Sequence, residues 1–98
     1  MKLGIEITSG AGSEDVRTLR KLVEAARRQG HEVRIFAMDH AVFQLAQLKD
    51  LSTPDRPVAI CAYNAHSWGV PRTEGILFGG QNDWAETVYW ADRVIVLG

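Results

Sequence analysis

The fold is decided by residues 3–33, which read LGIEITSGAGSEDVRTLRKLVEAARRQGHEV. Apolar residues alternate with small or polar ones over Leu3–Thr8, a period of two that is typical of a strand with one apolar face. After the glycine-rich turn Ser9–Gly12, Ser13 can cap a helix whose apolar residues recur at helical spacing until Gly30. His31–Met38 predicts a second strand, so the stretch forms a strand–helix–strand unit.

The rest of the chain continues this alternation. Asp39 can cap a shorter helix, and the apolar segments Val58–Tyr63 and Arg93–Leu97 both predict central strands covered on both faces. Between these strands, Asn82 can cap a helix over Asp83–Ala91. The pattern predicts an α/β fold, namely a single domain over residues 1–98 built as a three-layer α/β/α sandwich.

The predicted sheet is small and parallel, with its four strands, numbered along the chain, in the order 2-1-3-4. In that order the first and third strands are neighbours. Because ligand crevices form beyond the carboxyl ends of strands at such a switch point, the Ser9–Ser13 turn and Cys61 are expected to meet there.

Composition narrows the classes of function. The 98 residues contain 11 Lys and Arg against 12 Asp and Glu, so neither nucleic acid nor an anionic membrane is expected as a partner. No apolar run approaches the roughly 20 residues that span a bilayer, and no signal-peptide pattern follows Met1, which favours a cytoplasmic location. A domain this small gains stability by self-association, which favours a homo-oligomer.

The turn after the first strand is a candidate anion-binding site. Ser9, Gly10, Gly12 and Ser13 combine hydroxyls with backbone N–H groups at a helix start, where an anion can be bound without a basic side chain. The turn lacks the lysine of a P-loop and does not match GxGxxG. A plain turn with a helix cap explains the same residues.

Cys61 is the candidate nucleophile. It is the single cysteine, which excludes a disulfide framework, a CxxC pair and a thiolate-rich zinc site. A cysteine in an apolar strand is often only a small buried residue. Reactivity requires an exposed strand end and a group that favours the thiolate, for which His66, Arg72 and the helix N-terminus after Ser13 are candidates. No metal site is expected, since His31 and His40 have no partner at ligand spacing.

The stretch from Asn64 to Gln81 has no clear periodicity. It holds four glycines, Pro71 and the aromatic residues Trp68 and Phe78, and is expected to be a long loop. Trp68 and Phe78 are candidates for contact with a partner or a second subunit. The alternative is that both side chains pack on the domain's own core.

The order and spacing of these segments resemble the DsrE/DsrF-like family. The resemblance rests on Lys2–Gly10 with Ser13–Val16, Gly30–Val33, Phe36–Val42, the Cys61 strand and Ala91–Val96. It implies an α/β/α domain that assembles into trimers, hexamers or mixed oligomers, some members carrying sulfur as a cysteine persulfide. In those members the reactive cysteine lies at or just after the third strand, where Cys61 stands.

The leading prediction is a cysteine persulfide carrier or sulfurtransferase subunit in an intracellular sulfur relay, with Cys61 as the catalytic residue. Its expected partners are a protein sulfur donor and acceptor, and no cofactor is required because one thiol suffices for persulfide exchange. Two alternatives stay open. One is a non-catalytic assembly or regulatory subunit with a structural Cys61, in which Trp68, Phe78 and Trp90 make contacts; the other is a small anion- or nucleotide-binding module.

Overall fold

The computed structural model describes residues 1–10 and 12–98. Within them, a parallel sheet is formed by β1 (Lys2–Ile7), β2 (Glu32–Ala37), β3 (Val58–Cys61), β4 (Ile76–Gly79) and β5 (Arg93–Leu97). The connections contain α1 (Asp15–Arg28), the 3₁₀ helix η1 (Asp39–Phe43), α2 (Leu45–Lys49), α3 (Ala62–Ser67) and α4 (Gln81–Trp90).

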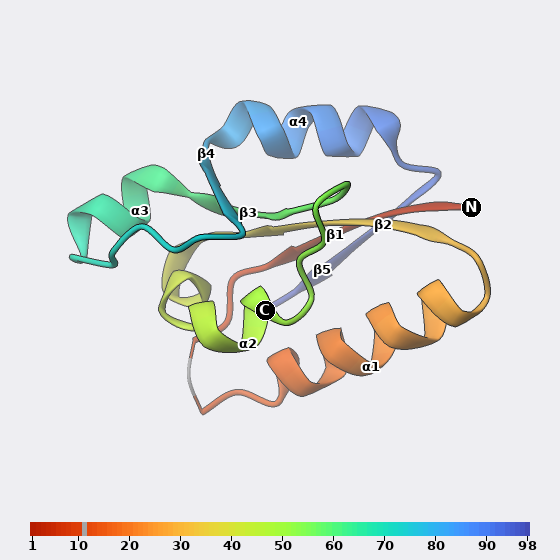
Figure 1. Cartoon of the computed structure of the whole chain (residues 1–98), viewed down its shortest axis with the longest axis horizontal. Coiled ribbons are helices and arrows are strands. Elements are labelled where there is room, and N and C mark those ends of the chain that lie inside the picture. The colour runs from red at the N-terminus through yellow and green to blue at the C-terminus, as the bar shows by residue number, and fades with distance from the viewer. Residues whose placement is uncertain (11) are drawn as a thin grey trace.

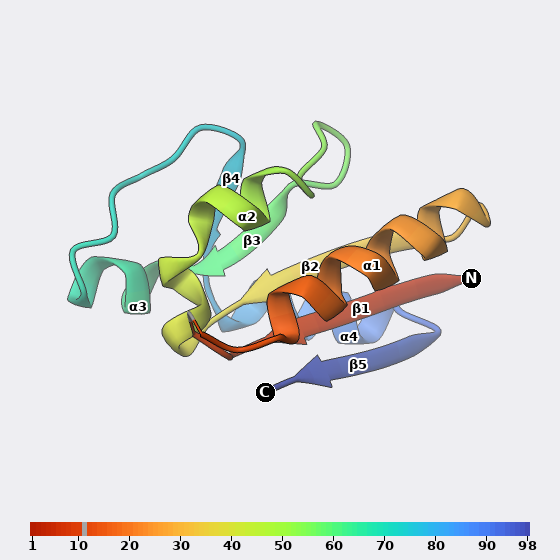
Figure 2. The ribbon, with the colours of Figure 1, turned by 90° about the horizontal axis from the view of Figure 1, so that it is seen from below.

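The elements form three layers, as predicted. In Figure 1 α4 covers one face of the sheet, while α1 and α2 lie on the other. Figure 2, seen from the α1 side, shows α3 beyond the carboxyl ends of the strands. Among the described residues, no helix is long and apolar enough to cross a membrane.

The predicted strand order is wrong. The order is β4-β3-β2-β1-β5, so β1 lies between β2 and β5 and is separated from β3 by β2. From β1 to β4 the chain adds strands in one direction, with α1 and α2 on one face; α4 then crosses the other face, and β5 lies beside β1. A right-handed crossover that reverses direction must change face in this way. The switch point therefore lies between β1 and β5.

The stretch from Asn64 to Gln81 is not the predicted long loop, because it contains most of α3 and all of β4. β4 pairs with β3 over four residues, from Val58↔Ile76 to Cys61↔Gly79. Four residues that end in glycine give too short an alternation to identify a strand, and pairing with β3 supplies the order that the local pattern does not.

The secure part of the prediction is the first strand–helix–strand unit. Ser13 Oγ accepts the backbone N–H of Asp15 at 3.0 Å, although the N-cap of α1 is Glu14. The helix ends at Arg28, and Gly30 follows two residues later with a φ of 83°, which suits glycine. His31 N–H donates to the carbonyl of Ala26 at 3.0 Å, which completes the helix C-terminal motif. The apolar side of α1 packs on side chains of β1 and β2 in the main core. The core includes Leu19 and Val23 from α1, Ile5 and Ile7 from β1, and Ile35 from β2.

β5 departs from the prediction of a central strand, because it lies at the sheet edge. Ile95 and Leu97 pack against the main core, but Val94 and Val96 on the α4 face are 41% and 55% exposed. The segment is apolar on both faces, yet only one face is covered within this chain.

Candidate functional site

Cys61 is the last residue of β3 and the N-cap of α3. Its side chain belongs to a small cluster with Phe36 and Ala59 on the α4 face of the sheet, against which Met38 and Trp84 pack. The Trp84 and Phe36 rings are stacked with their centroids 6.2 Å apart. Cys61 is 6% exposed, so the thiol lies at the end of a strand beneath partly buried side chains.

Asn64 contacts the sulfur of Cys61 through its backbone. Its backbone N–H donates to Cys61 Sγ at 3.5 Å, and its side-chain Oδ1 accepts the backbone N–H of Asp39 at 2.9 Å. Asp39 itself has a φ of 56°, an unusual backbone for a non-glycine residue. Asn64 thus ties the turn after β3 to the turn after β2. The sequence signal was its position three residues after the cysteine, where an N-cap side chain accepts an N–H.

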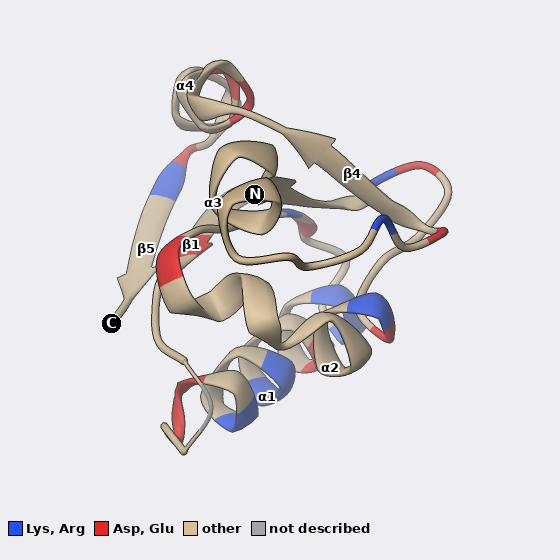
Figure 3. Cartoon of the chain, turned by 90° about the vertical axis from the view of Figure 1, so that its left-hand side faces the viewer, with Lys and Arg blue, Asp and Glu red and all other residues tan. Residues whose placement is uncertain are grey.

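The predicted thiolate stabilisers do not meet Cys61. His66 is exposed on α3, and the Arg72 guanidinium lies 5.4 Å from the centroid of the Phe78 ring, which packs against the core on the opposite face of the sheet. Within the described residues, no hydrogen bond joins either side chain to the sulfur. Figure 3 shows no charged residue on α3. Their role in stabilising the thiolate stays a prediction.

The candidate anion-binding turn has its own polar contacts. The Ser9 hydroxyl donates to the Asp15 carboxylate, and the Ser13 hydroxyl oxygen accepts the Asp15 backbone N–H. Glu14 and Asp15 bring two acidic groups to the helix start, which disfavours an anion there. Ala11 lies outside the described residues. Anion binding by Ser9, Gly10, Gly12 and Ser13 stays a prediction.

The turn does not share a crevice with Cys61, because the two strands that carry them are not neighbours. A β-carbon added to Gly10 would lie 2.9 Å from Cβ of His40, so the turn abuts η1. An open hollow of about 550 Å³ lies instead at the β1–β5 switch point, lined by Thr8, Ser9, Gly10, His40, Phe43 and Gly98.

The two candidate contact aromatics have different environments. Trp68 is 40% exposed and stacks on His40 and Phe43, with ring centroids 5.1 and 5.4 Å apart. Phe78 is partly buried and packs against the main core. Trp68 is therefore the more available of the two for contact with another protein.

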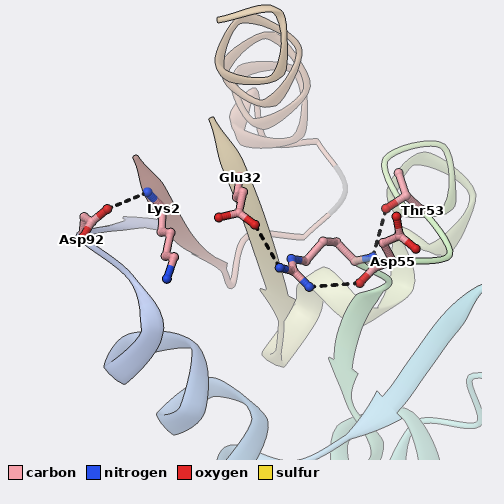
Figure 4. A network of polar contacts seen from close by, with 6 residues as sticks. Lys2, Glu32, Thr53, Asp55 and Asp92 are labelled. Atoms are coloured by element: carbon pink, nitrogen blue, oxygen red, sulfur yellow. Dashed lines mark hydrogen bonds and ion pairs between the residues drawn. The ribbon is translucent and has the colours of Figure 1, made fainter. Parts of the chain in front are cut away.

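Trp90, at the end of α4, is surrounded by basic side chains. The Arg34 guanidinium lies 4.3 Å from the Trp90 ring centroid, and the Lys2 and Arg56 cations lie within 5.8 Å. Arg56 also pairs with Glu32 at 3.0 Å, in the polar network of Figure 4. These contacts join the end of α4 to the amino-terminal ends of β1 and β2 and to the segment before β3.

Glu6 lies on the α4 face of β1. It is opposite Phe36 on β2 and Val96 on β5. Burial raises the pKa of this carboxyl above the ordinary value of 4.5. Among the described residues, no group of His, Cys, Asp and Glu could hold a metal ion.

The comparisons with known proteins concern the fold and the family separately. The chain is similar in structure to the ychN protein of E. coli, with a TM-score of 0.73 and 20% identity over 98% of this chain and 97% of that one. No curated protein matches the sequence. The model of the DsrE/DsrF-like family matches residues 1–97, which supports a sulfur-relay-related function in general. The chain therefore belongs to the DsrE/DsrF-like family.

Proposed function

We propose that this protein is a persulfide carrier or sulfurtransferase subunit of a cytoplasmic sulfur relay and that Cys61 holds the sulfur. The observation that carries the proposal is the position of the thiol at the carboxyl end of β3, where it accepts the Asn64 N–H at 3.5 Å. A backbone N–H aimed at sulfur can stabilise the negative charge that the sulfur carries as it attacks or leaves during exchange. Membership of the DsrE/DsrF-like family supports the same chemistry.

The transfer consists of two balanced exchanges. The Cys61 thiolate attacks the outer sulfur of a donor persulfide, the donor's S–S bond breaks, and the donor leaves as a thiolate. An acceptor thiolate then attacks the outer sulfur of Cys61–S–SH, and Cys61 leaves as a thiolate. The sulfane sulfur moves without an external oxidant or reductant, so the chain needs one cysteine only.

For this cycle to run, the side chains that pack over Cys61 must make room for the added sulfur. A persulfide adds a sulfur about 2.05 Å beyond Sγ, and Cys61 is 6% exposed. Met38 and Trp84, which pack against its cluster, are themselves only partly buried. We expect these side chains to move aside when donor or acceptor docks. Trp68, exposed on the turn after α3, is the candidate docking contact.

A homo-oligomer, trimer or hexamer, is part of the proposal. Val94 and Val96 are apolar and largely exposed on the α4 face of β5, and Tyr89 on α4 is 94% exposed. Figure 1 shows α4 over this side of the sheet. Exposed apolar side chains of this kind are often buried in subunit contacts. Light scattering should show an assembly that Val96→Lys dissociates; a monomeric native chain would contradict this.

The alternative with a specific observation in its favour is a non-catalytic subunit. Cys61 packs with Phe36 and Ala59, as a structural cysteine does. In that role the thiol does not react in the folded protein.

The test is to incubate the native chain with a persulfide donor and measure its intact mass. The proposal predicts an adduct of about 32 Da, one sulfur atom, that is absent in Cys61→Ala and disappears when an acceptor thiol is added. The Cys61→Ala chain is the matched control, because alanine fills most of the same space and cannot form a persulfide. A chain that stays unmodified while folded, or an adduct that no thiol removes, would refute the carrier role.

A further inference from the structure

A small hollow lies beneath α4 on the face of the sheet that carries Cys61. Its volume is about 220 Å³, and its wall includes Arg34, Arg56, Ala59, Leu77, Asp83 and Glu86. The strands contribute Arg34 from β2, Ala59 from β3 and Leu77 from β4, while Asp83 and Glu86 come from α4. The hollow is therefore bounded by the sheet on one side and by a helix on the other.

The wall of this hollow carries both signs of charge. Arg34 and Arg56 are the cations, and within the described residues Arg34 has no carboxylate partner. Asp55, Asp83 and Glu86 are the anions; one Asp83 oxygen accepts the Gly80 N–H at 2.7 Å as part of the cap of α4. The two signs suit a molecule with both a carboxylate and an ammonium group.

The hollow adjoins the position of Cys61. Ala59 is part of its wall and lies in the same side-chain cluster as Cys61, two residues before it along β3. Side chains two residues apart on a strand share a face and are about 7 Å apart. Asp83 lies against Gly79, the residue paired with Cys61 on β4, since a β-carbon on Gly79 would overlap its carboxylate.

We propose that this hollow binds a small zwitterionic thiol, an amino-acid or dipeptide thiol, as the low-molecular-weight partner of Cys61. The ligand's carboxylate lies at Arg34 and Arg56, its ammonium at Asp83 and Glu86, and its sulfur toward Cys61. The role of the ligand as a sulfur acceptor rests on the proposed function of Cys61. As acceptor, the ligand's thiolate attacks the outer sulfur of Cys61–S–SH; the Cys61 thiolate leaves, and the ligand departs as its persulfide.

The test measures binding without transfer, so that it does not depend on the persulfide. Cys61→Ala protein is titrated with S-methyl-L-cysteine, which cannot exchange sulfur, and binding is followed by calorimetry and by NMR shifts of residues around the hollow. Saturable binding is expected, with shifts at Ala59 and Leu77. Two analogues are compared: 3-(methylthio)propionate lacks the ammonium, and 2-(methylthio)ethylamine lacks the carboxylate. Both should bind at least tenfold more weakly.

Variants locate the site. Arg34→Ala should weaken S-methyl-L-cysteine binding at least tenfold, whereas Arg93→Ala, which removes an exposed guanidinium on β5, should leave it unchanged. Since Arg34→Ala also removes a contact to Trp90, exposed Glu86→Gln serves as a second variant; it should weaken S-methyl-L-cysteine but not 3-(methylthio)propionate. Absence of saturable binding, equal binding of all three compounds, or equal loss in Arg93→Ala would overturn the proposal. If binding succeeds and no persulfide forms on Cys61, the proposed function fails and the site stands.

Discussion

Replacement of Trp84 by alanine tests whether this side chain limits access to Cys61. Trp84 packs against the cluster that contains the cysteine and stacks on Phe36 with ring centroids 6.2 Å apart. An aromatic pair contributes about 1 kcal/mol beyond its buried area, and the apolar contact of a half-buried indole contributes about 1 kcal/mol more. If the ring must leave this contact before Cys61 reacts, the variant lowers that cost by about 2 kcal/mol, a rate increase of about 30-fold.

The assay is the pseudo-first-order reaction of the native chain with an aromatic disulfide reagent, followed by its coloured thiolate. Trp90→Ala is the matched control, because it removes an indole from the other end of α4, where the ring contacts Arg34 rather than the cysteine cluster. Trp90→Ala should leave the rate within about twofold of the wild-type value. Equal acceleration in both variants would show that general loosening of α4 exposes the thiol. No acceleration in Trp84→Ala would show that Trp84 is not the barrier.

Three further predictions concern stability and pH. Gly4→Val should lower the free energy of unfolding by about 1–3 kcal/mol in urea titrations, because a β-carbon at Gly4 would already lie 2.9 Å from Cγ2 of Thr87 on α4; an unchanged midpoint would contradict the packing of α4 on β1. Asp39→Val should be less stable than Asp39→Gly by about 1–2 kcal/mol, because Asp39 has a φ of 56°, and equal midpoints would contradict that backbone. Glu6→Gln should stabilise the chain slightly at neutral pH and leave it unchanged well below pH 4.5, because burial raises the pKa of Glu6 and folding therefore opposes its ionisation as pH rises through the folded pKa. A benefit confined to acid pH would refute this.

The first half of the fold could be predicted because its signals are local. The alternation of Leu3, Ile5 and Ile7 and the helix stop at Gly30 each act within a few residues, and the structure places both as expected, while the N-cap of α1 is Glu14, one residue after the predicted Ser13. Strand order depends on which face each crossover covers. That property belongs to the whole chain, so the predicted β1–β3 neighbourhood was wrong.

At the candidate site, the position of Cys61 could be predicted from the sequence, but its surroundings could not. The position of Cys61 at the end of an apolar strand could be read from the pattern of residues 58–63. The groups near it could not be predicted. β4 is too short to show a period, and α4, which covers the same face, lies about twenty residues later in the sequence. Trp84 and Asn64, rather than His66 and Arg72, are therefore the neighbours that the structure identifies.

The most direct test of the account is to alkylate Cys61 across a series of low urea concentrations and compare the rate with the free energy of global unfolding. A functional thiol that opens by local movement of its cover reacts in the absence of urea, at a rate that depends little on urea until the unfolding transition begins. If, from zero urea upward, the alkylation rate equals the rate expected from the globally unfolded fraction, Cys61 reacts in the unfolded chain alone. That result would contradict a carrier role.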